Sequence, residues 1–177
     1  VRKHMEFLSK CNNNVKVATF VFNEDLREDL KLQIQNLTLP NMELQIRYYG
    51  GTGYSYGCWN DVIKTNMNNC DYFFLIEDDY LPTSTDFYAP FVERTNEATP
   101  YVCCYVRDEP VRHAANSNAL VDAHSCRKVF NRFGEVFTEL NCTNLQQAWH
   151  TQTYFLNLFK EMGYGMTDTT DAYPVSY

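Results

Sequence analysis

The chain has 177 residues, of which 45% are hydrophobic and 21% charged, a composition typical of one globular domain. Its net charge of −7 argues against a nucleic-acid-binding protein, because such proteins usually present a basic face. No apolar run is long enough to cross a membrane and no signal peptide is visible, so we expect no membrane span and a cytoplasmic location. The opening Val-Arg-Lys-His is compatible with an excised piece of a larger polypeptide.

The cysteines have no Cys-x-x-Cys spacing and are odd in number, seven in all. Cys103 and Cys104 are adjacent in a predicted strand, so their side chains should point to opposite faces of it. This pattern favours buried free thiols in a reducing compartment over a disulfide framework.

The predicted elements alternate between strands and helices. The first half of the chain has a polar lead-in over 1–14, then a strand over 15–22, a helix over 26–37, a strand over 42–49, a helix over 58–68 and a strand over 71–76. The second half has a short helix within 83–93, strands over 101–106, 118–123 and 164–167, helices over 125–133 and 144–162, and a polar tail over 168–177. This order predicts a single α/β domain, a sandwich with a central, largely parallel sheet flanked by helices.

Helix ends and stripes are also predicted. Ser125 is the expected N-cap of the helix that Gly134 closes, and Gly163 should close the last helix. Thr85 or Asp86 should cap the short helix within 83–93. The buried side of the last helix is expected to carry Leu145, Trp149, Gln152, Leu156 and Phe159.

An acidic segment follows the most apolar predicted strand. Residues 72–76 read Tyr-Phe-Phe-Leu-Ile, and Glu77, Asp78 and Asp79 come directly after them. Adjacent carboxylates repel one another, and a divalent cation held by their oxygens would compensate that repulsion. On an extended backbone Glu77 and Asp79 point to one side and Asp78 to the other. The alternative interpretation is an acidic turn in solvent.

Two further loops follow predicted strands, at residues 23–25 and 50–53. Ligands of parallel α/β sheets bind outside the carboxyl ends of the strands, so these loops and the acidic segment are predicted to share one crevice.

The sequence resembles the GT-A-fold nucleotide-sugar glycosyltransferases. Val17-Ala-Thr-Phe-Val-Phe-Asn-Glu24, followed by a helix, looks like the opening of that fold, and residues 72–82 resemble its Asp-x-Asp segment. The Glu-Asp-Asp form with Asp86-Phe87 downstream is similar to that of N-acetylglucosaminyltransferase I-like enzymes. The resemblance implies a Rossmann-like GT-A sandwich, a metal cofactor (Mn²⁺ or Mg²⁺) and a nucleotide-sugar donor.

The resemblance also implies roles for individual residues. Asp79 would be the direct metal ligand, and Glu77 would join it directly or through water. The residues implied in nucleotide-sugar binding are Asn23, Glu24, Gly51, Gly53, Glu77 and Asp78, with Asp78 near the ribose. Tyr49 stands where many members place an Asp that reads the base, and a tyrosine could stack on uracil instead.

The catalytic base is not assigned by the resemblance. Related inverting enzymes carry a Glu-Asp pair about a dozen residues before a Gly-Tyr, whereas this chain has Thr151-Gln152 there. Three carboxylates in the second half are candidates, in the order Glu139, Asp122, Asp108. His150 could be an additional metal ligand, although its place within a helix favours a surface position.

The resemblance implies a metal-dependent hexosyltransferase that uses a nucleotide diphosphate sugar, with a UDP-sugar expected, and a glycan or protein-linked glycan acceptor. The chain is short for the family, so other domains of a larger polypeptide are possible partners. Compact enzymes of this kind occur in large DNA viruses that glycosylate their capsids, which would place the protein in host cytoplasm. Two alternatives stay open, a non-catalytic sugar-nucleotide-binding relative and a dinucleotide-binding enzyme suggested by Gly51-x-Gly53-x-x-x-Gly57.

Overall fold

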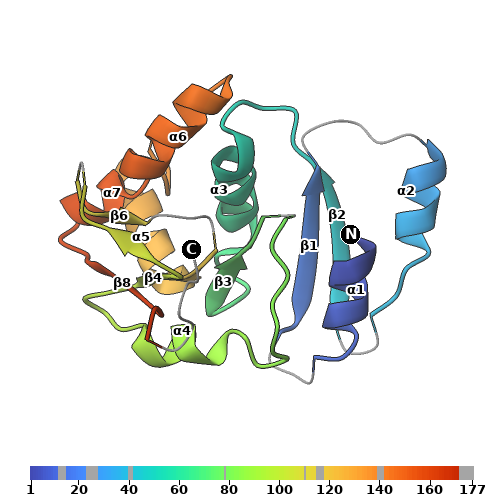
Figure 1. Ribbon diagram of the computed structural model, residues 1–177. Coiled ribbons are helices and arrows are strands. Elements are labelled where there is room, and N and C mark those ends of the chain that lie inside the picture. Colours follow the sequence, from blue (N-terminus) through green and yellow to red (C-terminus); the bar gives the residue numbers. More distant parts are fainter. Residues whose placement is uncertain are drawn as a thin grey trace. The chain divides into compact units, whose positions relative to one another are not determined.

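The computed structural model describes residues 1–11, 15–22, 28–39, 42–77, 79–109, 111–114, 118–138 and 142–171 (Figure 1). The chain divides into two compact units. The first unit is Val1–Gly51 with Asp78–Phe87, and the second unit is Thr52–Glu77 with Tyr88–Tyr177. Within the described ranges, no helix is both long and apolar enough to cross a membrane.

The first unit is built on two parallel strands. β1 (Val17–Phe22) pairs with β2 (Glu43–Tyr48), with Val17 opposite Glu43 and Phe22 opposite Tyr48. Helix α2 (Glu28–Gln35) lies between them in the chain, as a parallel connection requires. No side chain of either strand is fully buried. This strand–helix–strand order agrees with the sequence prediction.

The lead-in of the first unit contains a helix that the sequence analysis did not predict, α1 (Arg2–Leu8). Met5 is its buried residue, and the ring of Phe7 lies 5.7 Å from that of Phe87. The His4 ring Nε2 lies 2.7 Å from the carbonyl oxygen of Tyr80. Helix α1 therefore packs against the 79–87 segment of the same unit.

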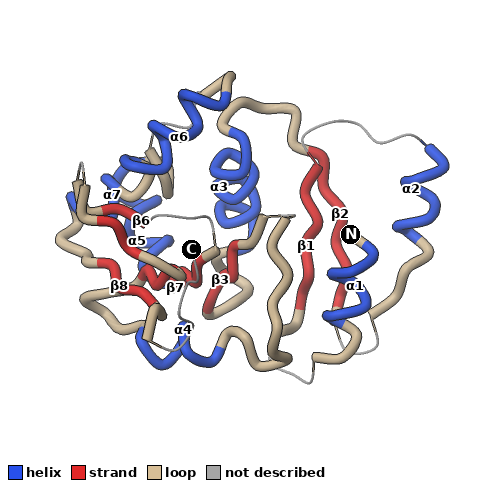
Figure 2. The backbone as a smooth tube through the Cα atoms, in the orientation of Figure 1, coloured by secondary structure: helices blue, strands red, loops and turns tan. Residues whose placement is uncertain are grey.

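The second unit is organised around a four-stranded sheet (Figure 2). Its strands are β3 (Tyr72–Leu75), β4 (Tyr101–Cys103), β7 (Ala119–Asp122) and β8 (Met166–Asp168), in the spatial order β3-β7-β4-β8. Strand β7 is antiparallel to both of its neighbours, and β4 is parallel to β8. Consequently β3, β4 and β8 all run in one direction, and β7 alone is reversed.

The predicted mixed α/β class is confirmed, but the described residues contain no large, central parallel sheet. The sheets are small and mixed: the β1–β2 pair, the four-stranded sheet and a hairpin of β5 (Val106–Arg107) with β6 (His113–Ala114). The connection from β4 to β7 carries the β5–β6 hairpin among its described residues, whereas parallel strands are usually joined by a helical crossover.

Five helices of the second unit are described: α3 (Tyr54–Asn66), α4 (Ala89–Arg94), α5 (Ala123–Phe133), α6 (Leu145–Tyr154) and α7 (Asn157–Glu161). One face of the sheet, with Tyr101, Cys103 and Val121, belongs to a large apolar cluster that includes residues of α3, α5 and α7. The other face, with Val102 and Leu120, packs with Phe91 of α4. Cys103 and Cys104 belong to these two different clusters, and all seven cysteines are free.

Aromatic rings fill the centre of the large cluster. The Phe155 ring lies 4.9 Å from Tyr56, 5.7 Å from Tyr101 and 5.3 Å from Phe137. Tyr101, Phe137 and Phe155 are at most 1% exposed. The abundance of aromatic residues is thus explained in large part by the core.

The predicted helix over 144–162 is two helices. Helix α6 ends where the backbone N–H of Phe155 donates to the carbonyl oxygen of Thr151. Leu156 precedes α7 and has φ −89° and ψ 10°. The predicted stripe is wrong at its start, because Leu145 and Trp149 are 59% and 65% exposed. Ala148 and Thr151 are the buried residues of α6.

Helix caps were predicted with mixed success. Asn144 accepts a hydrogen bond from Gln147 N and caps α6, and Gly134 ends α5 with φ 79° as expected. Ser125 is not the N-cap of α5: Asp122 holds that position and accepts from Ser125 N at 2.7 Å. Helix α4 begins after Tyr88, so neither Thr85 nor Asp86 caps it.

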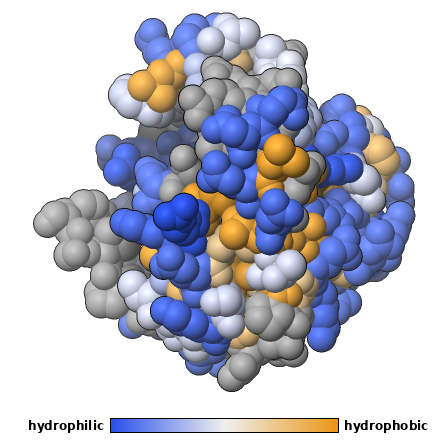
Figure 3. Space-filling model, turned by 90° about the vertical axis from the view of Figure 1, so that its right-hand side faces the viewer, coloured by the Kyte–Doolittle hydropathy of each residue, from blue (hydrophilic) through white to orange (hydrophobic). Residues whose placement is uncertain are grey.

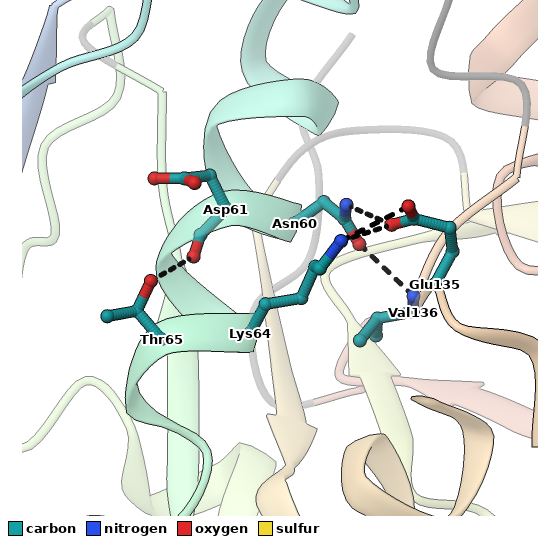
Figure 4. A network of polar contacts seen from close by, with 6 residues as sticks. All are labelled: Asn60, Asp61, Lys64, Thr65, Glu135 and Val136. Atoms are coloured by element: carbon teal, nitrogen blue, oxygen red, sulfur yellow. Dashed lines mark hydrogen bonds and ion pairs between the residues drawn. The ribbon is translucent and has the colours of Figure 1, made fainter. Parts of the chain in front are cut away.

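A polar network joins α3 to the segment after α5 (Figure 4). Asn60, 7% exposed, donates to Glu135 Oε2 at 2.7 Å and accepts from Val136 N at 3.1 Å. Lys64 Nζ lies 3.0 Å from the same carboxylate. Because Asn60 satisfies a backbone N–H and a carboxylate together, it fixes the segment after Gly134 onto the helix.

Candidate functional site: the carboxyl edge of the four-stranded sheet

The acidic segment begins where β3 ends. Glu77 follows Leu75 by two residues and is half-buried. Its Oε1 accepts a hydrogen bond of 2.7 Å from the hydroxyl of Ser55, in the first turn of α3. A hydrogen bond from a hydroxyl to a carboxylate is charge-assisted and stronger than one between neutral groups. The first turn of α3 and the end of β3 therefore meet at Glu77.

Gly53 makes this meeting possible. It precedes α3 with φ 106°, in the left-handed region, and Tyr54 follows with φ 50°. A side chain at Gly53 would be strained at that φ value. The Gly53 N–H donates to the carbonyl of Cys142 at 3.0 Å, which fixes the turn within the second unit. The helix starts at Tyr54, four residues earlier than predicted, and so carries Ser55 to Glu77.

The strand register defines the edge of the sheet at which Glu77 lies. Leu75 and Cys103 both pair with Ala119, and Cys103 also pairs with Asp168, so these residues form one row across the sheet. The residues one step beyond this row are Ile76, Asn118, Cys104 and Thr169. We call this end of the four-stranded sheet, where β3, β4 and β8 finish and β7 begins, the carboxyl edge.

Two buried polar groups at the carboxyl edge lack partners. Asn118 Oδ1 and Thr169 Oγ1 are buried and have no hydrogen-bond partner among the described residues. Thr169 is 0% exposed and Asn118 is 8% exposed. Leaving such a group unpaired costs about 1–3 kcal/mol, so a polar ligand or water would be favoured beside it. The third unpaired group, the Tyr101 hydroxyl, lies in the aromatic core instead.

Asp168 was not identified from the sequence, which assigned it to a polar tail. Its Oδ2 accepts from Val106 N at 3.0 Å, and its Oδ1 accepts from Thr170 N at 3.2 Å. The carboxylate thus joins the β5–β6 hairpin to the carboxyl edge. The sequence did offer one signal for Asp168. It is an acidic residue directly after a predicted strand, as Glu77 is.

The predicted nucleotide-binding glycine Gly51 lies in the first unit beside Tyr49. A Cβ built on Gly51 would come within 2.5 Å of the Tyr49 ring, so any larger residue would have to displace that ring. Tyr49 is half-buried. The pair explains why a glycine occupies this position, because the aromatic ring covers it.

The predicted metal ligand Glu77 belongs to the second unit, and the predicted metal ligand Asp79 belongs to the first. Asp79 is exposed. Carboxylate oxygens fit Mg²⁺ or Mn²⁺, which commonly take one or two protein carboxylates and complete their shell with phosphate and water. Within the described ranges, no group of three or more His, Cys, Asp or Glu residues could hold a metal by itself. Asn23, Glu24, Asp78 and the candidate base Glu139 lie outside the described residues.

The two described base candidates each have another structural partner. Asp122 caps α5 and pairs with Tyr72 at the opposite end of β3. Asp108 lies at the tip of the β5–β6 hairpin, where it forms a 2.8 Å ion pair with Arg112. His150 is exposed, with its ring 4.8 Å from that of Tyr154.

Comparison of the chain with protein-family models, with curated proteins and with solved structures found no match.

Proposed function

We propose that the protein is a metal-dependent glycosyltransferase that transfers a hexose from a nucleotide diphosphate donor, with a UDP-sugar expected, to a glycan or protein-linked glycan. The observation that carries this proposal is the hydrogen bond between Ser55 and Glu77. It joins the helix that follows the glycine-rich loop to the acid that ends a core strand, and in α/β proteins such strand ends are where ligands bind.

Glu77 and Asp79, two positions apart in the chain, would hold Mn²⁺ or Mg²⁺. The metal would neutralise the negative charge that develops on the departing diphosphate. Ser55 orients the Glu77 carboxylate through its hydroxyl. This support keeps one carboxylate oxygen in place before any ligand arrives, which lowers the cost of binding.

The unpaired polar groups at the carboxyl edge, Asn118 Oδ1 and Thr169 Oγ1, are both buried, so they suit an internal water rather than the sugar itself. Glu139 remains the proposed base, since Asp122 caps a helix and Asp108 is paired with Arg112.

Thermal unfolding with UDP-sugars, GDP-sugars and NAD, each with and without Mn²⁺, tests the proposal. Stabilisation by a sugar nucleotide should require the metal and should disappear in Asp79→Asn and Glu77→Gln. The matched control is Glu93→Gln, which changes an exposed carboxylate of α4 and should respond as the natural chain does. Stabilisation by NAD without metal would instead identify the dinucleotide-binding alternative.

A second candidate is a sugar-nucleotide-binding protein without catalytic activity. The engagement of Asp108 in an ion pair and of Asp122 in a helix cap favours it. Mass spectrometry of donor and product separates the two candidates. Metal-dependent binding with release or transfer of the sugar supports the enzyme, and the same binding with an intact donor supports the non-catalytic protein.

A further inference from the structure

A cavity of about 340 Å³ lies in the second unit, far along the sheet from Glu77. It is lined by Arg112, Lys160, Tyr164, Gly165 and Met166. Met166 is the first residue of β8 and pairs with Tyr101, the first residue of β4. Glu77 lies just beyond the end of β3, and β3 and β8 are the two edge strands of this sheet. The cavity and the carboxyl edge therefore occupy opposite corners of the four-stranded sheet.

The backbone on one side of the cavity is held by hydrogen bonds. Gly163 ends α7 with φ 81°, and Tyr164 N donates to Phe159 O at 3.0 Å. Gly165 N donates to Ala98 O at 2.7 Å. A Cβ on Gly165 would come within 3.2 Å of Thr99 Cγ2, so the strand entry is closely packed there. This wall is formed before any ligand binds, which favours affinity.

Lys160 gives the cavity a positive charge that is not neutralised. Its Nζ donates to the Arg112 carbonyl at 2.9 Å, and it forms no ion pair with any described residue. Partial burial lowers the pKa of Lys160. Arg112 adds a second cation, although its guanidinium is paired with Asp108. An oxyanion in the cavity could therefore pair with this ammonium through a charge-assisted hydrogen bond.

The remaining walls are apolar. Tyr164 and Met166 offer an aromatic ring and a thioether to the cavity, and thioethers contact aromatic rings favourably. The volume falls within the range of about 300–1,000 Å³ that small-molecule sites occupy. Cationic and apolar side chains thus line the same cavity.

We propose that this cavity binds a small organic anion, an oxyanion group such as carboxylate or phosphate attached to an apolar ring. Lys160 binds the oxyanion, Arg112 lies beside it, and Tyr164 and Met166 contact the ring. The site is separate from the proposed transferase site, and its occupation does not depend on a metal.

Titration of the ¹⁵N-labelled protein with phenyl phosphate and with benzoate tests this site. We expect saturable amide shifts at Gly165 and Met166 and none at Ser55 and Glu77. Benzyl alcohol, which keeps the ring and lacks the charge, should shift these amides much less at equal concentration. Inorganic phosphate, which lacks the ring, should also bind more weakly. Equal response to benzyl alcohol, or shifts centred on Glu77, would contradict the proposal.

Lys160→Met keeps most of the apolar stem and removes the charge. It should weaken phenyl phosphate binding about ten- to a hundred-fold, the factor that one hydrogen bond to a charged group provides. Lys160→Arg should restore most of the affinity. The matched control, Lys128→Met, removes a lysine paired at 3.5 Å with Glu97 elsewhere in the unit and should leave the affinity unchanged. Unchanged binding by folded Lys160→Met would overturn the assignment of the oxyanion to Lys160.

Discussion

The two units differ in how completely they bury their strands. In the second unit, every residue of β4 is buried, and β7 is buried except at Asp122. In the first unit, β1 and β2 have only partly buried or exposed residues. A pair of strands is marginal by itself, whereas a sheet of three or more strands with a packed face is stable. The stability of the described fold is therefore concentrated in the second unit.

Figure 3 turns the right-hand side of Figure 1, where α2 and β2 are drawn, toward the viewer. Figure 3 shows hydrophobic residues gathered near the middle of this face, among hydrophilic ones. Within the first unit, Val17, Leu32 and Tyr48 are 43%, 58% and 44% exposed. Elements that bind ligands are often taken from the less stable parts of a protein, and several predicted nucleotide-binding residues belong to this unit.

The largest expected effect is the loss of an aromatic ring from the core. Phe155→Ala should lower the free energy of unfolding by about 3–5 kcal/mol, because the ring is fully enclosed by other side chains. The counterpart in the first unit, Phe20→Ala, removes a partly exposed ring of β1 and should cost clearly less. Urea unfolding followed by circular dichroism measures both. Equal losses would show that the two units are equally well packed.

The Asn60 network should have the second largest effect. Asn60→Ala removes the hydrogen bonds of the Asn60 amide to the Val136 N–H and the Glu135 carboxylate. We therefore expect the free energy of unfolding to fall by about 2 kcal/mol. Asn66→Ala is the matched control on the same helix, since the Asn66 amide bonds only its own turn at Val62 O. Thermal unfolding distinguishes the two, and a control that costs as much would contradict a special role for Asn60.

Removal of a helix cap should cost less. Asp122→Ala deletes the acceptor of Ser125 N and should destabilise the protein by about 1 kcal/mol. Asn144→Ala deletes the corresponding cap of α6, where the first turn is exposed, and should cost less than Asp122→Ala. Both values come from urea unfolding at pH 7. The reverse order would mean that the more buried helix gains nothing from its cap.

The smallest expected effect has the opposite sign. Tyr101→Phe removes a buried hydroxyl that has no partner among the described residues, so stability should rise by up to about 1 kcal/mol. Burial raises the pKa of the Tyr101 hydroxyl, which keeps it protonated. Tyr72→Phe, on an exposed tyrosine of β3, should change stability little. A loss of stability in Tyr101→Phe would indicate that the hydroxyl is hydrogen-bonded in solution.

Local signals in the sequence predicted local structure well. Gly134 was recognised as a helix end because a glycine stop depends on neighbouring residues, and the last helical stretch was predicted to begin at Asn144, which caps α6. Non-local features were predicted less well. The antiparallel pairing of β7 with β3 and β4 has no local signal in the sequence. The exposed Leu145 and Trp149 break the predicted stripe because their helix buries Ala148 and Thr151 instead.

The candidate site was predictable only in outline. The rule that ligands bind at strand ends directed attention to Glu77, and the acidic residues after an apolar strand carried that signal. The contact with Ser55 depends on the positive φ of Gly53 and could not be derived from spacing. The unpaired atoms of Asn118 and Thr169 depend on which strands flank β4, so no sequence pattern revealed them.

The place of β7 in the sheet has a consequence for synthesis of the chain. Strands β3 and β4 precede β7 in the sequence, yet β7 lies between them and supplies their shared pairing at Ala119. A nascent chain that ends before Asn118 has both strands but lacks the one that joins them. The sheet can close only after the ribosome has released residues 119–122, and β8 extends it later still. The apolar strand 72–75 therefore has no strand partner during synthesis until β7 emerges. Exposed, unpaired strands of this kind are prone to aggregate, which chaperones prevent.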